Sequence, residues 1–183
     1  HIKNLYKTKT ALEFTQDLDF LLKHYEAIDY SKFKEIAQGN TLLKKPSFLL
    51  SFDDGLREFD EIIAPILLKK GIPAICFLNS GFIDNKDLFF RYKASLLLEK
   101  LSNNKALENK ITSFFKHSKN ARESLLSVDY ENKNVLDQIA HSISYSFDDF
   151  LKEQKPYLET NQMNSLIKKG FHFGAHSINH PEY

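Results

Sequence analysis

Apolar residues alternate with polar ones at helical spacing through the first ~40 residues of the chain. Leu12, Leu18 and Leu21 follow this period. Gly39 and Asn40 then break the pattern, because glycine and asparagine favour turns. The N-terminal part of the chain is therefore predicted to be helical.

Three short apolar runs are candidates for buried β-strands, at residues 46–52, 72–78 and 171–175. A helical pattern precedes the second run and another precedes the third. Strands joined by a helix run parallel, since the crossover returns the chain to the same end of the sheet. The sequence therefore predicts an α/β fold with parallel strands.

Two helices between these runs have recognisable ends. The first is expected at residues 58–70, with Gly71 as its C-terminal stop. Pro65 lies inside it, so the regular helix either begins at the proline or kinks there. The second is expected to be capped by Thr160 and to end at Gly170.

Residues 84–158 break this strand and helix rhythm. Short helical patterns follow one another, separated by asparagine, serine and lysine, which predicts a large helical insertion. The pair Asp148 and Asp149 is expected to lie at the start of one of its helices. The mixture of Lys, Asp and Glu is most simply a solvated surface, with a partner surface or substrate lid as the alternative.

Composition places the chain among ordinary globular proteins. Its 183 residues, 42% hydrophobic and 27% charged, suffice for one sizeable core. The net charge of +1 argues against a nucleic-acid partner, which needs clustered basic surface. No apolar stretch approaches the ~20 residues of a membrane span. Cys76, the only cysteine, lies in an apolar run and is expected to be a buried hydrophobe.

The chain begins at His1 without an initiator methionine and stops three residues after His180. We expect the natural protein to continue at both ends. A missing N-terminal segment is compatible with an export signal at the start of the natural protein.

Three histidines near the C-terminus are spaced four residues apart: His172, His176 and His180. On a strand, this spacing separates side chains by ~13 Å, which is too far to share a metal ion. Where the chain turns, the same spacing brings them within ~6 Å. Pro181 and the Ser-Ile-Asn stretch favour a turn after His176. We therefore predict His176 and His180 as a ligand pair and His172 as a packed or hydrogen-bonded core histidine.

Asp53 and Asp54 follow the first apolar run, and Gly55 comes next. Neighbouring side chains on extended backbone point to opposite sides, so one carboxylate can bind a metal while the other faces a water. Gly55 permits a positive φ and close approach of other groups. An Asx-turn or helix N-cap is the alternative for this motif in isolation. Its place at the carboxyl end of a parallel strand, like that of His176, favours an active site.

The Phe-Asp-Asp-Gly motif at 52–55 and the His-Ser-x-x-His motif at 176–180 resemble the first two signature motifs of the NodB-type polysaccharide deacetylases, carbohydrate esterase family 4. The resemblance covers residues 46–83 and 160–183, with Ser51 in place of the usual threonine. It implies a distorted (β/α) barrel with parallel strands, of which this chain would be a partial copy carrying a large helical insertion.

By this resemblance Asp53 would be the catalytic base, and Asp54, His176 and His180 would hold a divalent metal, usually zinc. Two histidines and one carboxylate leave positions open for water and substrate. The implied reaction is hydrolysis of N- or O-acetyl groups of an acetylated glycan by a metal-activated water. The family also suggests a location in the cell envelope or outside the cell.

Residues 1–183 would be the N-terminal part of such a domain, truncated after the second motif. The family's later motifs, namely an Arg-Pro element, an acidic-Trp element and a strand with the general-acid histidine, do not occur in this sequence. We therefore expect this chain alone to turn over poorly, and the sequence assigns neither a general acid nor an oligomeric state.

Two other interpretations share some of these residues. A non-catalytic deacetylase-like domain would bind glycan or a protein partner, although such a module has no need of Asp53. A non-haem iron oxygenase also uses two histidines and a carboxylate. The parallel strand and helix pattern and the Asp pair speak against the oxygenase.

Overall fold

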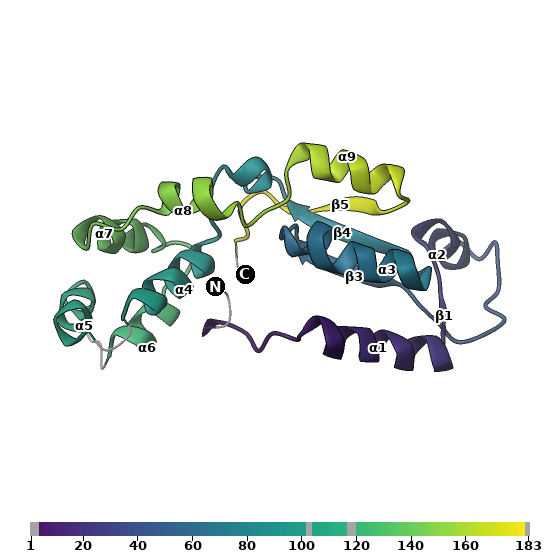
Figure 1. Cartoon of the computed structure of the whole chain (residues 1–183), viewed down its shortest axis with the longest axis horizontal. Helices are drawn as coiled ribbons and strands as arrows, with labels where there is room; N and C mark the ends of the chain where they lie inside the picture. The colour runs from purple at the N-terminus through teal and green to yellow at the C-terminus, as the bar shows by residue number, and fades with distance from the viewer. Residues whose placement is uncertain (1–3, 102–103, 117–119, 182–183) are drawn as a thin grey trace. The chain divides into compact units, whose positions relative to one another are not determined.

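A computed structural model describes residues 4–101, 104–116 and 120–181 of the chain. These residues form two compact units (Figure 1), each of which is described by itself. The sheet unit comprises residues 9–85 and 155–179, and the helical unit comprises residues 86–154 together with the described terminal residues 4–8 and 180–181.

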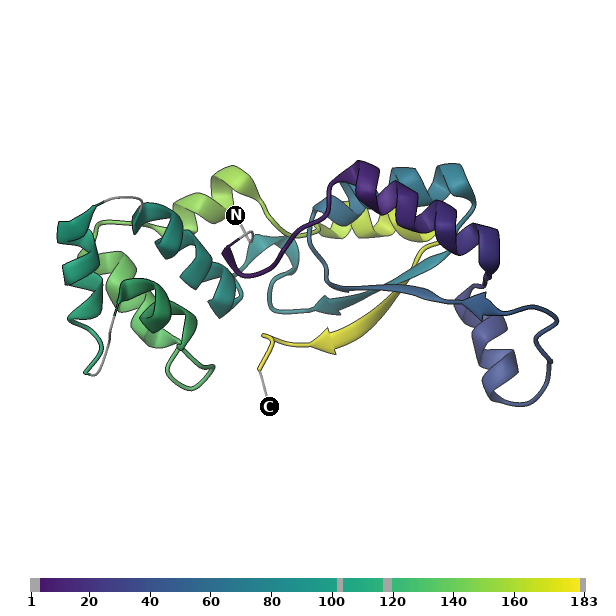
Figure 2. The same cartoon turned by 90° about the horizontal axis from the view of Figure 1, so that it is seen from below.

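The sheet unit is organised around a three-stranded parallel sheet. Its strands are β3 (Leu50–Asp54), β4 (Ala74–Asn79) and β5 (His172–Ser177), in the order β3-β4-β5. Figure 2 shows the yellow β5 beside the teal β4. The register pairs Asp54 with Leu78 and Asn79 with Ser177, so the carboxyl ends of the strands share one edge. The predicted α/β class with parallel strands is confirmed.

All three strands end later than the apolar pattern predicts, β4 by one residue and β3 and β5 by two. The pattern ends the first strand at Phe52 and the third at Ala175, whereas β3 continues through Asp54 and β5 through Ser177. Backbone pairing with β4 extends both strands, and that pairing does not depend on apolar side chains. Asp54 and His176 are therefore held by the sheet itself.

The helix between β3 and β4 opens with a π-helical turn (Phe59–Ile63), from which α3 (Ala64–Lys70) continues. Pro65 lies in the first turn of α3, where an N–H has no intrahelical partner. Of the two alternatives, the regular helix thus begins beside the proline and is not kinked by it. Gly71 ends the helix at φ 66°, and Gly170 at φ 95° ends the one before β5, as predicted.

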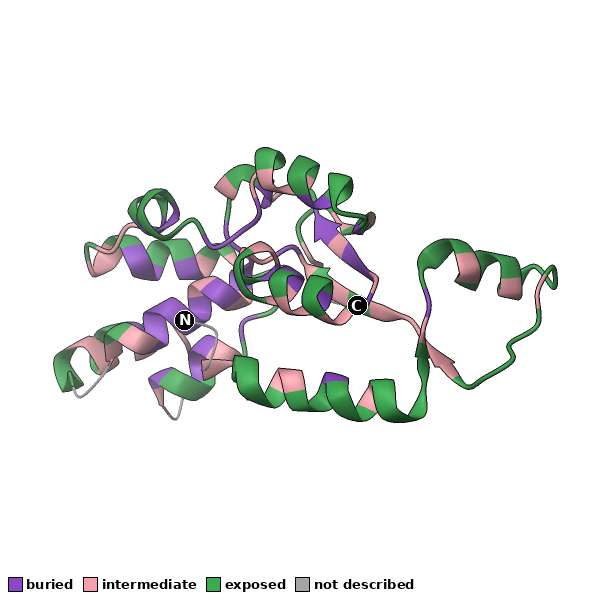
Figure 3. Ribbon diagram, turned by 45° about the vertical axis from the view of Figure 1, so that its right-hand side comes forward, coloured by how far each residue is buried: buried purple, intermediate pink, exposed green. Residues whose placement is uncertain are grey.

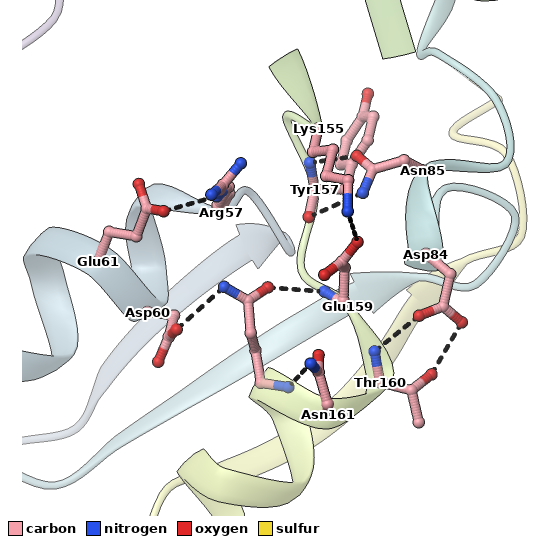
Figure 4. Close-up of polar contacts among 11 residues, drawn as sticks. Arg57, Asp60, Glu61, Asp84, Asn85, Lys155, Tyr157, Glu159, Thr160 and Asn161 are labelled. Atoms are coloured by element: carbon pink, nitrogen blue, oxygen red, sulfur yellow. Dashed lines mark hydrogen bonds and ion pairs between the residues drawn. The ribbon is translucent and has the colours of Figure 1, made fainter. Parts of the chain in front are cut away.

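That second helix, α9 (Thr160–Lys168), has Glu159 as its N-cap, so the expectation that Thr160 caps it is wrong. Thr160 lies one residue inside the helix. Its backbone N–H and its hydroxyl donate to the two carboxylate oxygens of Asp84, at 2.7 and 2.8 Å (Figure 4). The start of α9 is therefore tied to the segment that follows β4.

The core of the sheet unit lies between the sheet and its helices. Leu67 of α3, Leu166 of α9 and Cys76 of β4 are fully buried in one apolar cluster. The ring of Phe59 packs edge-on against that of Phe52, with 5.2 Å between centroids. The prediction that Cys76 is a buried hydrophobe is confirmed.

The N-terminal part of this unit contains α1 (Ala11–His24) and α2 (Tyr30–Ala37), as the helical pattern predicts. Two short strands, β1 (Glu26–Ala27) and β2 (Ser47–Phe48), pair in parallel and were not predicted. Helix α1 buries Leu18 and exposes most of its remaining surface (Figure 3).

The helical unit holds short helices, as the sequence indicates. Helix α4 (Phe90–Leu101) has more buried residues than any other helix described in this unit, among them Leu96 and Leu97. Asp148 and Asp149 lie in the first turn of α8 (Phe147–Gln154), where the Ser146 hydroxyl accepts from the Asp149 N–H, so this pair is a helix start. Between these two helices in the sequence are α5 (Lys105–Thr112), α6 (Ala121–Leu126) and α7 (Asn134–Ser142).

Among the described residues, no helix combines the length and apolar character that crossing a membrane requires.

Candidate metal centre

The backbone at the end of β3 has an unusual conformation. Asp54 has φ 71°, in the left-handed region that aspartate tolerates better than most residues. Gly55 follows at φ 68°, and a Cβ there would lie 2.6 Å from Cδ2 of Leu78. The positive φ and close approach predicted for Gly55 are therefore both present, and they fix the chain directly after the Asp54 carboxylate.

The side chains of Asp54 and His176 meet at the sheet edge. Nε2 of His176 lies 3.9 Å from Oδ1 of Asp54, with the side chains 36% and 32% exposed. Their strands flank β4, so both side chains reach over the end of the central strand. A half-exposed carboxylate beside an imidazole can be reached from solvent by an ion or a substrate group.

The chain turns directly after β5, as the sequence predicts. The backbone N–H of Ser80 donates to the Ser177 carbonyl at 3.1 Å, and that of Gly81 donates to the Ile178 carbonyl at 2.7 Å. His180 follows this turn at φ 55°. The loop after β4 therefore holds the turn between the two histidines of the motif.

Asp54, His176 and His180 each offer one ligand atom, and these atoms lie within 4.8 Å of one another. Two imidazole nitrogens and one carboxylate oxygen form a donor set that zinc and other divalent transition metals accept. The structure thus brings together the three residues that the sequence suggests as metal ligands, and their chemistry fits such an ion.

Asp53 and His172 lie outside this group. Asp53 is exposed, and among the described residues its carboxylate accepts no hydrogen bond. His172 is exposed at the start of β5, with its ring centroid 6.1 Å from that of Tyr30. The interpretation of His172 as a core histidine is therefore wrong, because β5 is the outer strand of this sheet.

Sequence reasoning missed two polar residues beside the candidate ligands. The Asn79 amide donates to Oδ1 of Asp54 at 2.7 Å, and its oxygen accepts from the Ser177 hydroxyl at 2.5 Å. Asn79 is completely buried. The signal in the sequence was a polar residue directly after the apolar run 72–78, at the strand end where the site lies.

A second polar cluster fixes the return of the chain into the sheet unit (Figure 4). The Leu158 N–H donates to the carbonyl of Gly55 at 2.9 Å. The Tyr157 N–H donates to Oδ1 of Asn85 at 2.9 Å. The residues before α9 therefore lie against the backbone that directly follows Asp54.

The fold and the grouped side chains agree with the comparison to known families. The family model described as polysaccharide deacetylase matches residues 41–183. The chain belongs to the polysaccharide deacetylase family, and the resemblance seen in its two motifs is confirmed.

Two solved structures are similar to this chain. The BpsB deacetylase domain from Bordetella bronchiseptica is 16% identical with a TM-score of 0.38, over 53% of this chain and 42% of that domain. IcaB from Ammonifex degensii is 14% identical with a TM-score of 0.41, over 97% of this chain and 82% of IcaB. The chain thus spans less than half of the BpsB domain. No curated protein matches the sequence significantly.

Proposed function

We propose that this protein is a metal-dependent deacetylase that hydrolyses N- or O-acetyl groups of an acetylated polysaccharide. Membership of the polysaccharide deacetylase family supports the reaction class. The observation that carries the proposal is the grouping of the Asp54, His176 and His180 ligand atoms within 4.8 Å. For such a substrate we propose a location in the cell envelope or outside the cell.

Asp54, His176 and His180 would hold the metal, and we propose zinc. Three protein ligands with nitrogen and oxygen donors are typical of catalytic zinc sites, which keep a position for water or substrate. When bound, the metal would supply Lewis acidity and lower the pKa of water. The partial exposure of Asp54 and His176 would let an acetyl group approach.

Asp53 is proposed as the general base. Its exposed carboxylate lies next to Asp54 in the chain, and one of its oxygens would accept a proton from the attacking water. The water oxygen forms a bond to the acetyl carbon, and the bond from that carbon to the sugar nitrogen or oxygen breaks. The proton passes to the sugar, and acetate and an amine or hydroxyl are released. A base in this role contributes a rate factor of about 10² to 10⁴.

The test is acetate release from an N-acetylglucosamine oligomer and from acetylated xylan, in the presence of zinc. Asp53→Asn should lower kcat by about 10²-fold or more while the zinc content stays at the parent level. Asp54→Asn should lose zinc and activity together. Asp149→Asn is the matched control, because Asp149 belongs to the similar Asp pair at the exposed start of α8.

Two outcomes would contradict the proposal. Parent-level turnover in Asp53→Asn would remove the base from the mechanism. A zinc-loaded full-length gene product that binds these glycans but releases no acetate would instead favour the non-catalytic, glycan-binding alternative.

A further inference from the structure

Asn79 occupies the centre of the sheet edge at which the candidate ligands lie. It is the last residue of β4, the strand between β3 and β5. The register shifts between Leu78 and Asn79, and Asn79 then pairs with Ser177. Its side chain is 0% exposed, so each of its polar atoms needs a partner within the protein.

The partners of Asn79 fix the orientation of its amide. An ionised carboxylate only accepts hydrogen bonds, so the Asn79 NH₂ group must face Asp54, at 2.7 Å. The amide oxygen then faces Ser177, whose hydroxyl donates to it at 2.5 Å. If the amide were reversed, its oxygen would face the carboxylate. That arrangement is unfavourable, because two buried acceptors would then face each other without a donor between them. Asp54 thus determines which way the Asn79 amide points, and the Ser177 hydroxyl then anchors the amide oxygen.

We infer that Asn79 is a positioning residue that holds the Asp54 carboxylate in its ligand orientation, with Ser177 as the anchor. This inference rests on the proposed metal site. The hydrogen bond from Asn79 restrains rotation of the carboxylate about its Cβ–Cγ bond, so the metal need not order that group when it binds. Residues that orient a ligand in this way affect metal affinity about 10- to 100-fold.

The measurement is the zinc dissociation constant of the 183-residue chain, obtained by competition with a chromogenic chelator. Asn79→Leu keeps a similar volume and removes the amide, and should weaken zinc binding about 10- to 100-fold. Ser177→Ala should weaken it less, because the amide donor remains but loses its anchor. Ser177→Thr keeps the hydroxyl and should restore parent affinity. The absorption spectrum of bound Co²⁺ should change in Asn79→Leu and not in Ser177→Thr.

Asn85→Gly is the matched control for general destabilisation. It removes the hydrogen bonds between Asn85 and Tyr157 in the same unit, and glycine accepts the φ of 56° at that position. This variant should unfold more easily and bind zinc like the parent.

Failure of the inference differs from failure of the proposed function. Folded Asn79→Leu with parent affinity, or Ser177→Thr no better than Ser177→Ala, would overturn the positioning role alone. If Asn79→Leu does not fold, the two Ser177 variants decide the matter. Absence of zinc binding by the parent chain would overturn the metal site and the positioning role together.

Discussion

The Asp54 carboxylate lies 3.9 Å from the imidazole of His176, although residues 86–154 of the helical unit separate the two residues in the sequence. The parallel order β3-β4-β5 produces this proximity, because it brings the carboxyl ends of the strands to one edge. A carboxylate from one outer strand and an imidazole from the other then face each other over the end of β4. The candidate site is thus a direct consequence of strand order.

Gly81→Ala should impair the turn that connects His176 to His180. A Cβ on Gly81 would lie 2.7 Å from the Ile178 carbonyl oxygen, which is backbone and cannot rotate away. The turn must shift, and overpacking of this kind costs about 1–3 kcal/mol. We expect zinc affinity to fall at least about tenfold, as when a supporting residue of a metal site is lost. Calorimetric titration measures this.

Ser80→Ala controls for that experiment. Ser80 is exposed, and its backbone hydrogen bond to Ser177 survives the substitution. This variant should bind zinc like the parent. Equal affinity in Gly81→Ala and the parent would show that the turn does not position His180.

Asp84→Asn should destabilise the start of α9. The amide oxygen can replace one acceptor, but the amide NH₂ can only donate to the Thr160 hydroxyl, so a charge-assisted bond is replaced by a weaker neutral one. Loss of such a cap interaction costs about 0.5–2 kcal/mol of unfolding free energy. Asparagine still tolerates the φ of 61° at this position, so backbone strain is not added.

Thr160→Val supplies the complementary measurement. It removes the hydroxyl and retains both shape and backbone N–H, so its cost in urea unfolding should match that of Asp84→Asn. The double variant should cost less than the sum of the two, since both delete the same hydrogen bond. Full additivity would argue that Asp84 and Thr160 do not act together.

Cys76 should react slowly with thiol reagents while the chain is folded. It is 0% exposed, and burial raises the pKa of its thiol from 9.0 to about 12. At pH 8 we expect labelling to be limited by unfolding and to become fast in denaturant.

The same shift gives the sign of the pH effect. The folded pKa lies above the unfolded one, so the contribution of Cys76 to stability is complete below about pH 9 and is lost as the pH rises toward 12. Rapid labelling of the folded chain at pH 8 would contradict the buried position.

Local signals in the sequence predicted much of this fold. Gly71 and Gly170 each end a helix at positive φ, where a side chain would be strained. The three apolar runs located the strands, and the resemblance of two motifs to the polysaccharide deacetylases then suggested Asp54, His176 and His180 as ligands. These features depend on local backbone geometry or on a short pattern, and both can be read without knowing the partners in space.

Other features depend on pairing that no local pattern encodes. The role of Asn79 follows from a register shift in β4 that sets it opposite Ser177. The exposure of His172 depends on β5 being an outer strand. Asp84 meets Thr160 only because the chain returns to the sheet unit beside the segment after β4. Such contacts join distant parts of the sequence, so composition and periodicity could not predict them.

A calorimetric zinc titration of the chain and of Asp54→Ala and His176→Ala tests the candidate metal centre most directly. Asp149→Ala and His172→Ala are matched controls, the first from the similar Asp pair and the second an exposed histidine of the same strand β5. We expect one site in the parent and in both controls, and its loss in Asp54→Ala and in His176→Ala. Zinc binding that survives either of these two substitutions, or disappears with His172→Ala, would contradict a metal centre built from the ends of β3 and β5.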